Sequence, residues 1–390
     1  MKPFLPYGRH QIDDGDIAAV VAVLKGGWLT TGPTVAAFER AFADYVGAKY
    51  AVACSSGTAG LHLAALALGL GPGDRVVVPT LTFLATANAP RYVGADVVFA
   101  DVDGGTGLMD RAALETALEQ GGVKAVFPVH LNGQCVDMEM VAAHGVAVVE
   151  DACHALGTTY RDGIRVGSCR HSKMAVFSLH AVKAIAMGEG GLITTNDAEI
   201  HRRLLRFRNH GMTREANDFT CADQAFDGGG DANPWYYEMA EPGFNYRASD
   251  IHCALGLSQL GKIDRFIDKR RALAARYDEA LRPLSPLVRP IDRAAHCDPA
   301  WHIYVVHMDF AAAGISRARA MAGLRERGIG SQVHYLPLHR QPYYRRLYGD
   351  ISLPGSDAYY RSCLTLPLYV AMTDGDVERV VAALSDVIAR

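Results

Sequence analysis

The sequence predicts an α/β protein with a mostly parallel mixed sheet flanked by helices. Short runs of β-branched and aromatic residues alternate with stretches whose apolar residues recur every three or four positions. Strands that alternate with helices in this way build parallel sheets covered on both faces. At 390 residues the chain is long enough for two domains. We expect a large domain with an N-terminal arm over residues 1–245. A long connecting helix and a smaller C-terminal α/β domain should occupy residues 246–390.

The expected elements of the large domain follow in chain order. Residues 13–26 indicate a helix after an Asp-rich start, and residues 34–47 a second amphipathic helix that ends at Gly47. The pattern then changes to strands that alternate with helices. The expected strands are residues 50–56, 75–80, 96–103, 123–130, 146–152, 174–180 and 190–196, with helices at 57–69 and 82–94.

The second part of the chain begins with an irregular stretch. Residues 215–247 show no periodicity and include the run DGGGDANPW. A loop of that length is more often functional or interface-forming than idle. A single long helix is expected over residues 249–281, capped by Ser249 or Asp250. A strand at 302–310 and a helix at 316–328 then belong to the smaller domain.

Composition excludes several classes of function. Lys and Arg total 39 against 42 Asp and Glu, a net charge of −3, whereas nucleic-acid binders carry a basic surplus. The N-terminus has no signal-peptide core, and the longest apolar stretches are too short to span a bilayer. The eight cysteines form no C-x-x-C pair. We therefore expect a cytoplasmic protein with no nucleic-acid or membrane partner, mostly buried thiols and no metal site.

Three features of the large domain carry chemistry, and the first is the stretch SSGTAGLHLA at residues 55–64. It joins a strand to a helix through a tight turn. The N–H groups at a helix N-terminus, together with the helix dipole, can bind a phosphate. Gly57 would let the backbone approach closely, and the Thr58 hydroxyl could add a donor. A purely structural strand–turn–helix is the alternative.

The second feature is VAVVEDACHALG, residues 146–157. Glu150 and Asp151 stand at the carboxyl end of a buried strand, where open parallel sheets bind their ligands. A carboxylate is costly to bury there unless it meets a cation. Either Asp151 caps the next helix, or it keeps a pyridine nitrogen protonated so that the ring can act as an electron sink.

The third feature is VFSLHAVKAIAMGEGG, residues 176–191. Ser178, His180 and Lys183 follow a strand end, and the glycines after them allow a tight reversal of the chain. A lysine desolvated in a crevice has a lowered pKa and becomes nucleophilic, whereas a typical loop lysine is simply solvated. A phosphate turn, a strand-end acid and then a lysine 32 residues later (151 to 183) together indicate a pyridoxal phosphate site.

These features lie in stretches that resemble the DegT-type nucleotide-sugar aminotransferases. The matching stretches run from residue 7 to about residue 370 and are GGWLTTGPTVAAFE, SSGTAGLHLA, PTLTFLATANA, VVEDACHALG, FSLHAVKAIAMGEGG, GFNYRASDIHCALGLSQL and QVHYLPLHRQPYY. The resemblance implies the aspartate-aminotransferase-like fold of type I PLP enzymes. It also implies pyridoxal 5'-phosphate (PLP) as cofactor and L-glutamate as amino donor.

Within that family, four further phrases are most similar to the branch that serves pseudaminic acid biosynthesis. These are PYGRHQIDDGDI, HGMTRE, PWYYEM and AWHIYVV. The similarity implies that a UDP-linked 4-keto-6-deoxy-L-sugar is aminated at C4.

The resemblance also implies roles for individual residues. It makes Lys183 the catalytic residue, which forms the Schiff base and carries the proton between the cofactor and the sugar carbon. The other implied cofactor contacts are Gly57, Thr58, Ala59 and Ser178 at the phosphate, Phe83 on the ring, Asp151 at the pyridine nitrogen and His154 near the 3-hydroxyl. Asn245 would reach the phosphate from a neighbouring subunit, which implies a homodimer with shared active sites. The implied sugar contacts, for which packing or loop capping is the alternative, are Trp28, Thr30, His180, His334 and Tyr335.

Other functions are weighed against this one. Sugar 3-dehydratases of the same family carry histidine in place of the lysine, so Lys183 favours transamination. A non-catalytic regulatory protein would need no nucleophilic lysine, and a dinucleotide-dependent dehydrogenase would need a G-x-G-x-x-G after the first strand, which is missing. The residues leave open whether the nucleotide is UDP, dTDP or GDP, and whether C4 or C3 is aminated.

Overall fold

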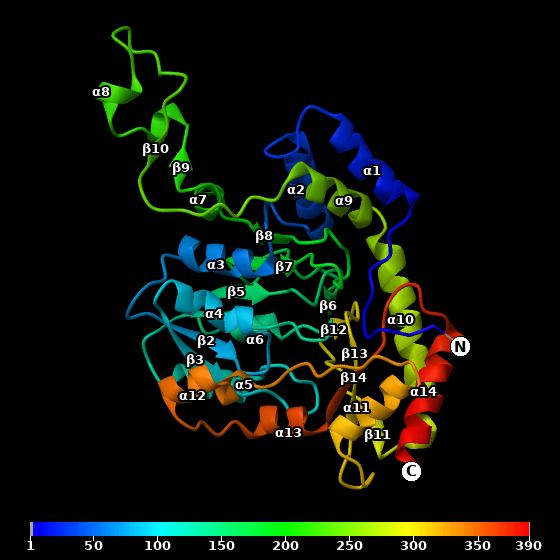
Figure 1. The fold of residues 1–390 in the computed structure, drawn as a ribbon. Coiled ribbons are helices and arrows are strands. Elements are labelled where there is room, and N and C mark those ends of the chain that lie inside the picture. The colour runs from blue at the N-terminus through cyan, green and yellow to red at the C-terminus, as the bar shows by residue number, and fades with distance from the viewer. Residues whose placement is uncertain (1–2, 390) are drawn as a thin grey trace.

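A seven-stranded sheet stands at the centre of the molecule in this computed structural model, which describes residues 3–389 (Figure 1). The strand order is β1-β8-β7-β5-β4-β2-β3. β8 runs antiparallel to both of its neighbours, and the other pairs are parallel, which confirms the predicted mixed sheet. The strands are β1 (Tyr50–Cys54), β2 (Arg75–Pro79), β3 (Asp96–Ala100), β4 (Val123–Val126), β5 (Ala147–Asp151), β7 (Met174–Ser178) and β8 (Gly191–Thr195).

Helices cover both faces of this sheet because successive strand residues point to opposite sides. In β2, Val76 and Val78 pack with helices α3, α4 and α7, whereas Val77 packs with α5 and α6 on the other face. The bounds of these helices are α3 (Gly57–Ala67), α4 (Leu84–Tyr92), α5 (Arg111–Leu118), α6 (Met138–Ala142) and α7 (Ala198–Arg208).

The prediction of a single long helix over residues 249–281 is wrong, because two helices occupy this range. α9 (Asp250–Leu260) packs against α1 (Asp14–Lys25) and α2 (Pro33–Val46), while α10 (Ile263–Ala280) packs against α14 (Asp374–Ile388). The chain turns between them at Gly261 and Lys262. Gly261 favours a break here because glycine weakens a helix. Lys262 is held by an ion pair to α1, with its Nζ 2.8 Å from Oδ1 of Asp16. The break therefore lets each half follow its own packing partner.

The caps of these helices resolve an ambiguity in the sequence. Ser249 caps α9 by accepting a hydrogen bond from the N–H of His252. The Asp250 carboxylate instead accepts from the N–H groups of Gly32 and Thr34, at 2.8 and 3.0 Å, at the start of α2. Asp250 therefore joins the two helices rather than capping its own.

A second sheet of three antiparallel strands forms in the C-terminal part, in the order β11-β13-β14. The expected strand at 302–310 and helix at 316–328 are found as β13 and α11. Two further helices return along the large sheet, where Tyr344 packs edge-on against Phe99 of β3. The bounds are β11 (Val288–Pro290), β13 (Tyr304–Met308), β14 (Cys363–Leu366), α11 (Arg317–Glu326), α12 (Pro342–Tyr348) and α13 (Pro354–Ser362).

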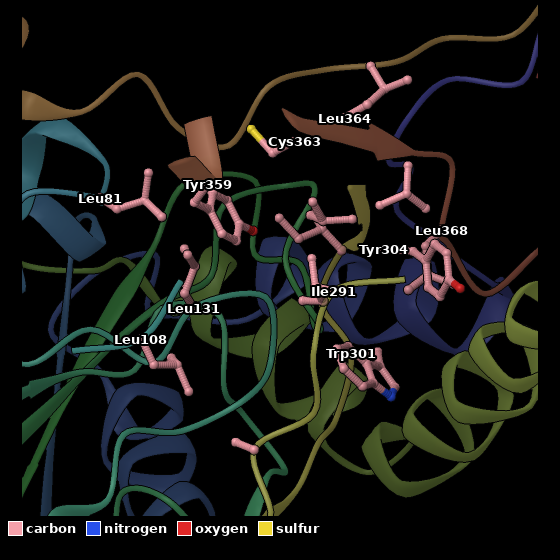
Figure 2. Close-up of a cluster of buried hydrophobic side chains, with 14 of the residues drawn as sticks. Leu81, Leu108, Leu131, Ile291, Trp301, Tyr304, Tyr359, Cys363, Leu364 and Leu368 are labelled. Carbon is pink, nitrogen blue, oxygen red and sulfur yellow. The ribbon is translucent and has the colours of Figure 1, made fainter. Parts of the chain in front are cut away.

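One hydrophobic cluster joins the two sheets. Figure 2 shows side chains from the connections of the large sheet, such as Leu81 and Leu131, in the same buried cluster as Tyr304 and Leu364 of the small sheet. This shared cluster fixes the C-terminal part against the large sheet. The domain boundary at residues 245 and 246 stays a prediction.

Most of the irregular stretch, with the few residues just before it, forms an extension that projects from the body of the molecule (Figure 1). It consists of the paired strands β9 (Met212–Thr213) and β10 (Glu238–Met239), helix α8 (Ala222–Ala225) and a helical turn at Ala216–Asp218. Elsewhere β6 (Thr159–Tyr160) pairs with β12 (Cys297–Asp298), and helical turns occur at Arg282–Leu284 and Leu338–Arg340. Within residues 3–389, no helix is long and apolar enough to cross a membrane.

Candidate active site

A cavity of about 620 Å³ opens at the edge of the large sheet where β5 and β7 end. Its walls come from the start of α3, the loop before α4, the loop between β7 and β8, and the segment 332–341 of the C-terminal part. The predicted site residues that line it are Gly57, Thr58, Phe83, Asp151, His154, Ser178, His180, Lys183, His334 and Tyr335. The fold thus brings together most of the residues selected from the sequence.

The turn before α3 presents free backbone donors to this cavity. The first N–H groups of a helix have no acceptor within the helix. Here the N–H of Ala59 donates to the Ser56 hydroxyl at 3.1 Å, and that of Gly60 donates to the Ser56 carbonyl. The N–H groups of Gly57 and Thr58 have no acceptor among the described residues and are left for a ligand. Ala59 therefore shapes the turn, and its own N–H is already occupied.

Gly57 is required by close packing at the same place. A Cβ at this position would lie 2.8 Å from Cβ of Ser178 and 3.3 Å from Sγ of Cys153. These contacts leave no room for a side chain. The glycine lets the helix start meet the end of β7, so that the N–H groups of the turn and the Ser178 hydroxyl lie along one wall of the cavity.

Asp151 is buried at the end of β5 and is held by two hydrogen bonds. Oδ2 accepts from the Thr86 hydroxyl at 2.6 Å, and Oδ1 accepts from the N–H of Cys153 at 3.1 Å. Residues 152–158 form turns, so Asp151 caps no helix. The carboxylate is therefore a fixed, buried negative charge that faces the cavity.

Glu150 has a different role from its neighbour because adjacent strand residues point to opposite faces. It is buried away from the cavity, where its carboxylate accepts hydrogen bonds from His130, Tyr160 and Ser172 at 2.9, 2.6 and 2.5 Å. Glu150 thus anchors the end of β5 from behind. Of the two carboxylates predicted to meet a ligand, only Asp151 lines the cavity.

Lys183 extends into the cavity from the loop between β7 and β8. The backbone of this loop is folded back on itself, with hydrogen bonds from Lys183 N to His180 O and from Met187 N to Leu179 O at 2.8 and 2.9 Å. Burial lowers the pKa of Lys183 from the ordinary value of 10.5, although the neighbouring Cys153 and Asp151 side chains act in the opposite direction. More of the amine is neutral near pH 7 than in a solvated lysine, so it can act as a nucleophile or a base.

Three neutral histidines and a tyrosine form the wall opposite. The rings of His154 and His302 lie 4.4 Å apart, and His154 Nε2 lies 3.1 Å from the Tyr335 hydroxyl. Burial, with the charge of Lys183, lowers the pKa of His334 to about 3. Burial likewise lowers the pKa of His154 and of His302 well below the usual range. This wall offers hydrogen bonds without adding positive charge.

Two residues at the mouth are exposed. The Phe83 side chain is 55% exposed, and its ring centre lies 6.1 Å from that of Tyr335. His180 is exposed as well, with Nε2 3.9 Å from the carboxylate of Glu189. Phe83 is thus available as an apolar surface for a flat ring, and His180 faces the solvent side of the cavity.

Three of the predicted residues lie outside this cavity, on the surface near α2 and α9. Trp28 is 60% exposed in the loop between α1 and α2, and Thr30 pairs with Ser249 through the backbone. Asn245 is exposed and pairs with Asn209 after α7. Beside them a second cavity, of about 890 Å³, is lined by residues of α2, α7 and the extension. Within one subunit these three residues cannot take the predicted roles.

Several cavity residues were not selected from the sequence. Thr82 lines the cavity just before α4, and its hydroxyl lies 2.8 Å from that of Thr86 in the first turn of α4, which holds Asp151 from behind. Tyr7 and Gln332 come from the N-terminal arm and from the segment that follows α11, and no local pattern marks them. His302 belongs to the phrase AWHIYVV, but its place in the cavity follows from tertiary packing.

The residues present fit pyridoxal phosphate. The turn before α3 offers donors to a phosphate, Asp151 offers a buried carboxylate to a pyridine nitrogen, and Lys183 offers an amine to an aldehyde. Nδ1 of His154 and Nδ1 of His302 are buried without a hydrogen-bond partner among the described residues. Such buried polar atoms beside a cavity are expected where a ligand completes the hydrogen bonds.

Comparisons with known proteins agree with this chemistry. Residues 10–385 match the model of the DegT/DnrJ/EryC1/StrS aminotransferase family. The spore coat polysaccharide biosynthesis protein SpsC of Bacillus subtilis (strain 168) is 40% identical over 99% of this chain and 97% of its own length.

Two solved structures have the same fold over almost their whole length. Helicobacter pylori PseC, an aminotransferase involved in the biosynthesis of pseudoaminic acid, superposes with a TM-score of 0.88 at 28% identity, covering 99% of both chains. The PLP form of Spr1654 from Streptococcus pneumoniae gives a TM-score of 0.87 at 27% identity over 99% of both chains, and that protein is also solved in its PMP form. The chain described here belongs to the DegT/DnrJ/EryC1/StrS aminotransferase family and is a PLP-dependent sugar aminotransferase.

Proposed function

We propose that this enzyme transfers the amino group of L-glutamate to C4 of a nucleotide-linked 4-keto-6-deoxy sugar, with a UDP-linked N-acetyl-L-sugar as the acceptor. The observation that carries the proposal is the Lys183 amine in one cavity with Asp151 and the start of α3. The acceptor is supported by the similarity to PseC, which is described as acting in pseudoaminic acid biosynthesis. The similarity to SpsC, a polysaccharide biosynthesis protein, supports sugar chemistry in general.

The cofactor would be held at its two ends. When bound, PLP supplies an electron sink for the negative charge left on a carbon that loses a proton. The N–H groups of Gly57 and Thr58, with the Ser178 hydroxyl, would bind the phosphate. Asp151, oriented by Thr86 and by the N–H of Cys153, would hold a proton at the pyridine nitrogen. Phe83 would cover one face of the ring.

Lys183 would perform the proton transfers of the reaction. Its Nζ would hold the aldehyde of the cofactor, and the same amine would carry the proton to and from the substrate carbon. Because burial lowers its pKa, the amine is more readily neutral and able to accept that proton. Glutamate would leave as 2-oxoglutarate before the keto-sugar binds, in ping-pong order. His180, His334 and Tyr335 would face the sugar.

The proposal includes a cytoplasmic homodimer with shared sites. Asn245, Trp28 and Thr30 are exposed and lie outside the cavity of their own subunit, so they could serve only the cavity of another copy. The extension beside them carries exposed aromatic side chains, including Trp235 at 73% exposure. Exposed apolar groups gathered in this way are typical of subunit interfaces.

The test is a glutamate-dependent assay of the purified enzyme against a panel of nucleotide-linked 4-keto-6-deoxy sugars, with the product followed by mass. Turnover of the UDP-linked N-acetyl-L-sugar, lost in Lys183→Ala, is the expected result. Turnover of only a dTDP- or GDP-linked sugar, or amination at C3, would keep the transaminase and refute this acceptor.

A further inference from the structure

Cys135, His296 and Cys297 form a cluster of metal-ligating side chains outside the cavity of Lys183. The two Sγ atoms and one ring nitrogen of His296 lie within 4.8 Å of one another. Cys135 is buried, whereas His296 and Cys297 are half-buried, so an ion from solvent can reach the cluster. The cysteines are 162 residues apart in the chain, which explains why their spacing forms no ligand motif.

The side chains of His296 and Cys297 are already oriented by hydrogen bonds to the backbone of Cys135. Its N–H donates to Sγ of Cys297 at 3.4 Å, and its carbonyl accepts from Nε2 of His296 at 2.7 Å. The second bond places the proton on Nε2 and leaves the lone pair on Nδ1. Metal-ligating histidines in proteins are fixed in this way, through a hydrogen bond from the ring nitrogen that does not bind the ion. The pairing of β12 with β6 also holds Cys297 in register with Tyr160.

The donor set selects the kind of ion. Two cysteine sulfurs and one imidazole nitrogen suit zinc, which binds sulfur at about 2.3 Å and nitrogen at about 2.0–2.1 Å in tetrahedral geometry. Donors at those bond lengths lie roughly 3.5–4 Å apart. The present separations, all within 4.8 Å, need a contraction of at most about 1.3 Å to reach that geometry.

We propose that Cys135, His296 and Cys297 bind one Zn²⁺ ion, with water as the fourth ligand. The ion would tie the loop that follows β4 to strand β12. Both segments contribute to the wall of the cofactor cavity, through Val129 and His302. They are joined by a hydrogen bond from the N–H of His302 to the carbonyl of Asn132 at 3.1 Å. The ion would therefore stabilise the position of His302, and it takes no part in the transfer of the amino group.

The test is a titration of the reduced, chelator-treated holoenzyme with Co²⁺, whose tetrahedral thiolate complexes absorb visible light, followed by displacement with Zn²⁺. His296→Gln and Cys297→Ser change the site at its two more accessible ligands. Cys221→Ser is the matched control, since Cys221 is exposed in the distant extension. Retained PLP absorbance shows that each variant is folded.

We expect the wild type and Cys221→Ser to bind one Co²⁺ per chain and to melt at higher temperature with Zn²⁺. Affinity should fall in His296→Gln and Cys297→Ser by at least the ~10–100-fold that loss of an outer-shell partner costs. Unchanged binding in Cys297→Ser, or no binding by the reduced wild type, overturns the proposal. A Cys135–Cys297 disulfide in protein purified without reductant, combined with no metal binding after reduction, overturns it in favour of a redox pair.

Discussion

Replacing Thr86 by valine should weaken cofactor binding and turnover through its effect on Asp151. The Thr86 hydroxyl lies 2.6 Å from Oδ2 of Asp151, and the N–H of Cys153 donates to Oδ1 at 3.1 Å. Valine keeps the shape of the threonine side chain and removes the hydroxyl. The carboxylate then loses one of the two contacts that fix its direction.

The size of the effect follows from the burial of the pair. Both side chains are buried, so water cannot replace the lost donor without reorganisation. A hydrogen bond to a charged group contributes about 1.5–3 kcal/mol, and about 1.4 kcal/mol is a factor of ten in an equilibrium or rate constant. The loss therefore corresponds to about 10–150-fold, divided between the affinity for PLP and the rate of transamination.

The assay separates these two effects and includes a matched control. PLP is titrated into the apoenzyme by absorbance, and the half-reaction with L-glutamate is followed in a single turnover. Thr86→Ser keeps the hydroxyl and should lose much less than Thr86→Val. Wild-type values for Thr86→Val in both measurements, or an equal loss in Thr86→Ser, would refute the reasoning.

Three further predictions concern the phosphate turn, the lysine and the subunit interface. Gly57→Ala should weaken PLP binding by about 5–150-fold, since overpacking costs about 1–3 kcal/mol and the new Cβ would lie 2.8 Å from Ser178 Cβ. Gly228→Ala, where the added Cβ meets no atom within 4 Å, should bind PLP normally in the same titration. Because the pKa of Lys183 is lowered in the folded apoenzyme, the unfolded chain binds more protons than the folded one between that pKa and 10.5. The melting temperature of the apoenzyme should therefore rise toward pH 10.5 relative to that of Lys183→Met. An equal pH dependence in both proteins would contradict this prediction. Mixing inactive Lys183→Ala with Asn245→Ala under conditions of subunit exchange should produce more turnover than the two separately, and a purely additive rate would argue against shared sites.

The meeting of Asp151 and Lys183 could be predicted because it depends on neighbouring strands. β5 and β7 are buried runs of β-branched and aromatic residues, and they pair in parallel, with Asp151 opposite Val176. Their carboxyl ends therefore lie at one edge of the sheet. The turn before α3 reaches the same edge, where Gly57 packs against Ser178. Local pattern and the rules of parallel sheets are sufficient for this part of the site.

The remainder of the site depends on packing that no local pattern encodes. His302 and Gln332 reach the cavity only because the small sheet shares a hydrophobic cluster with the large one. The break between α9 and α10 is set by different packing partners, although the helical periodicity continues through Gly261. Cys135 and Cys297 come together across 162 residues. In each case the deciding contact lies far away in the sequence.

The most direct single measurement is the location of the cofactor on the chain. The holoenzyme is treated with borohydride, which makes a carbon–nitrogen link between cofactor and lysine permanent, and its peptides are identified by mass. The pyridoxyl group should be found on Lys183, and Lys183→Ala should carry none and show no glutamate-dependent turnover. A pyridoxyl group on another lysine, or full turnover by Lys183→Ala, would contradict the role given to this residue.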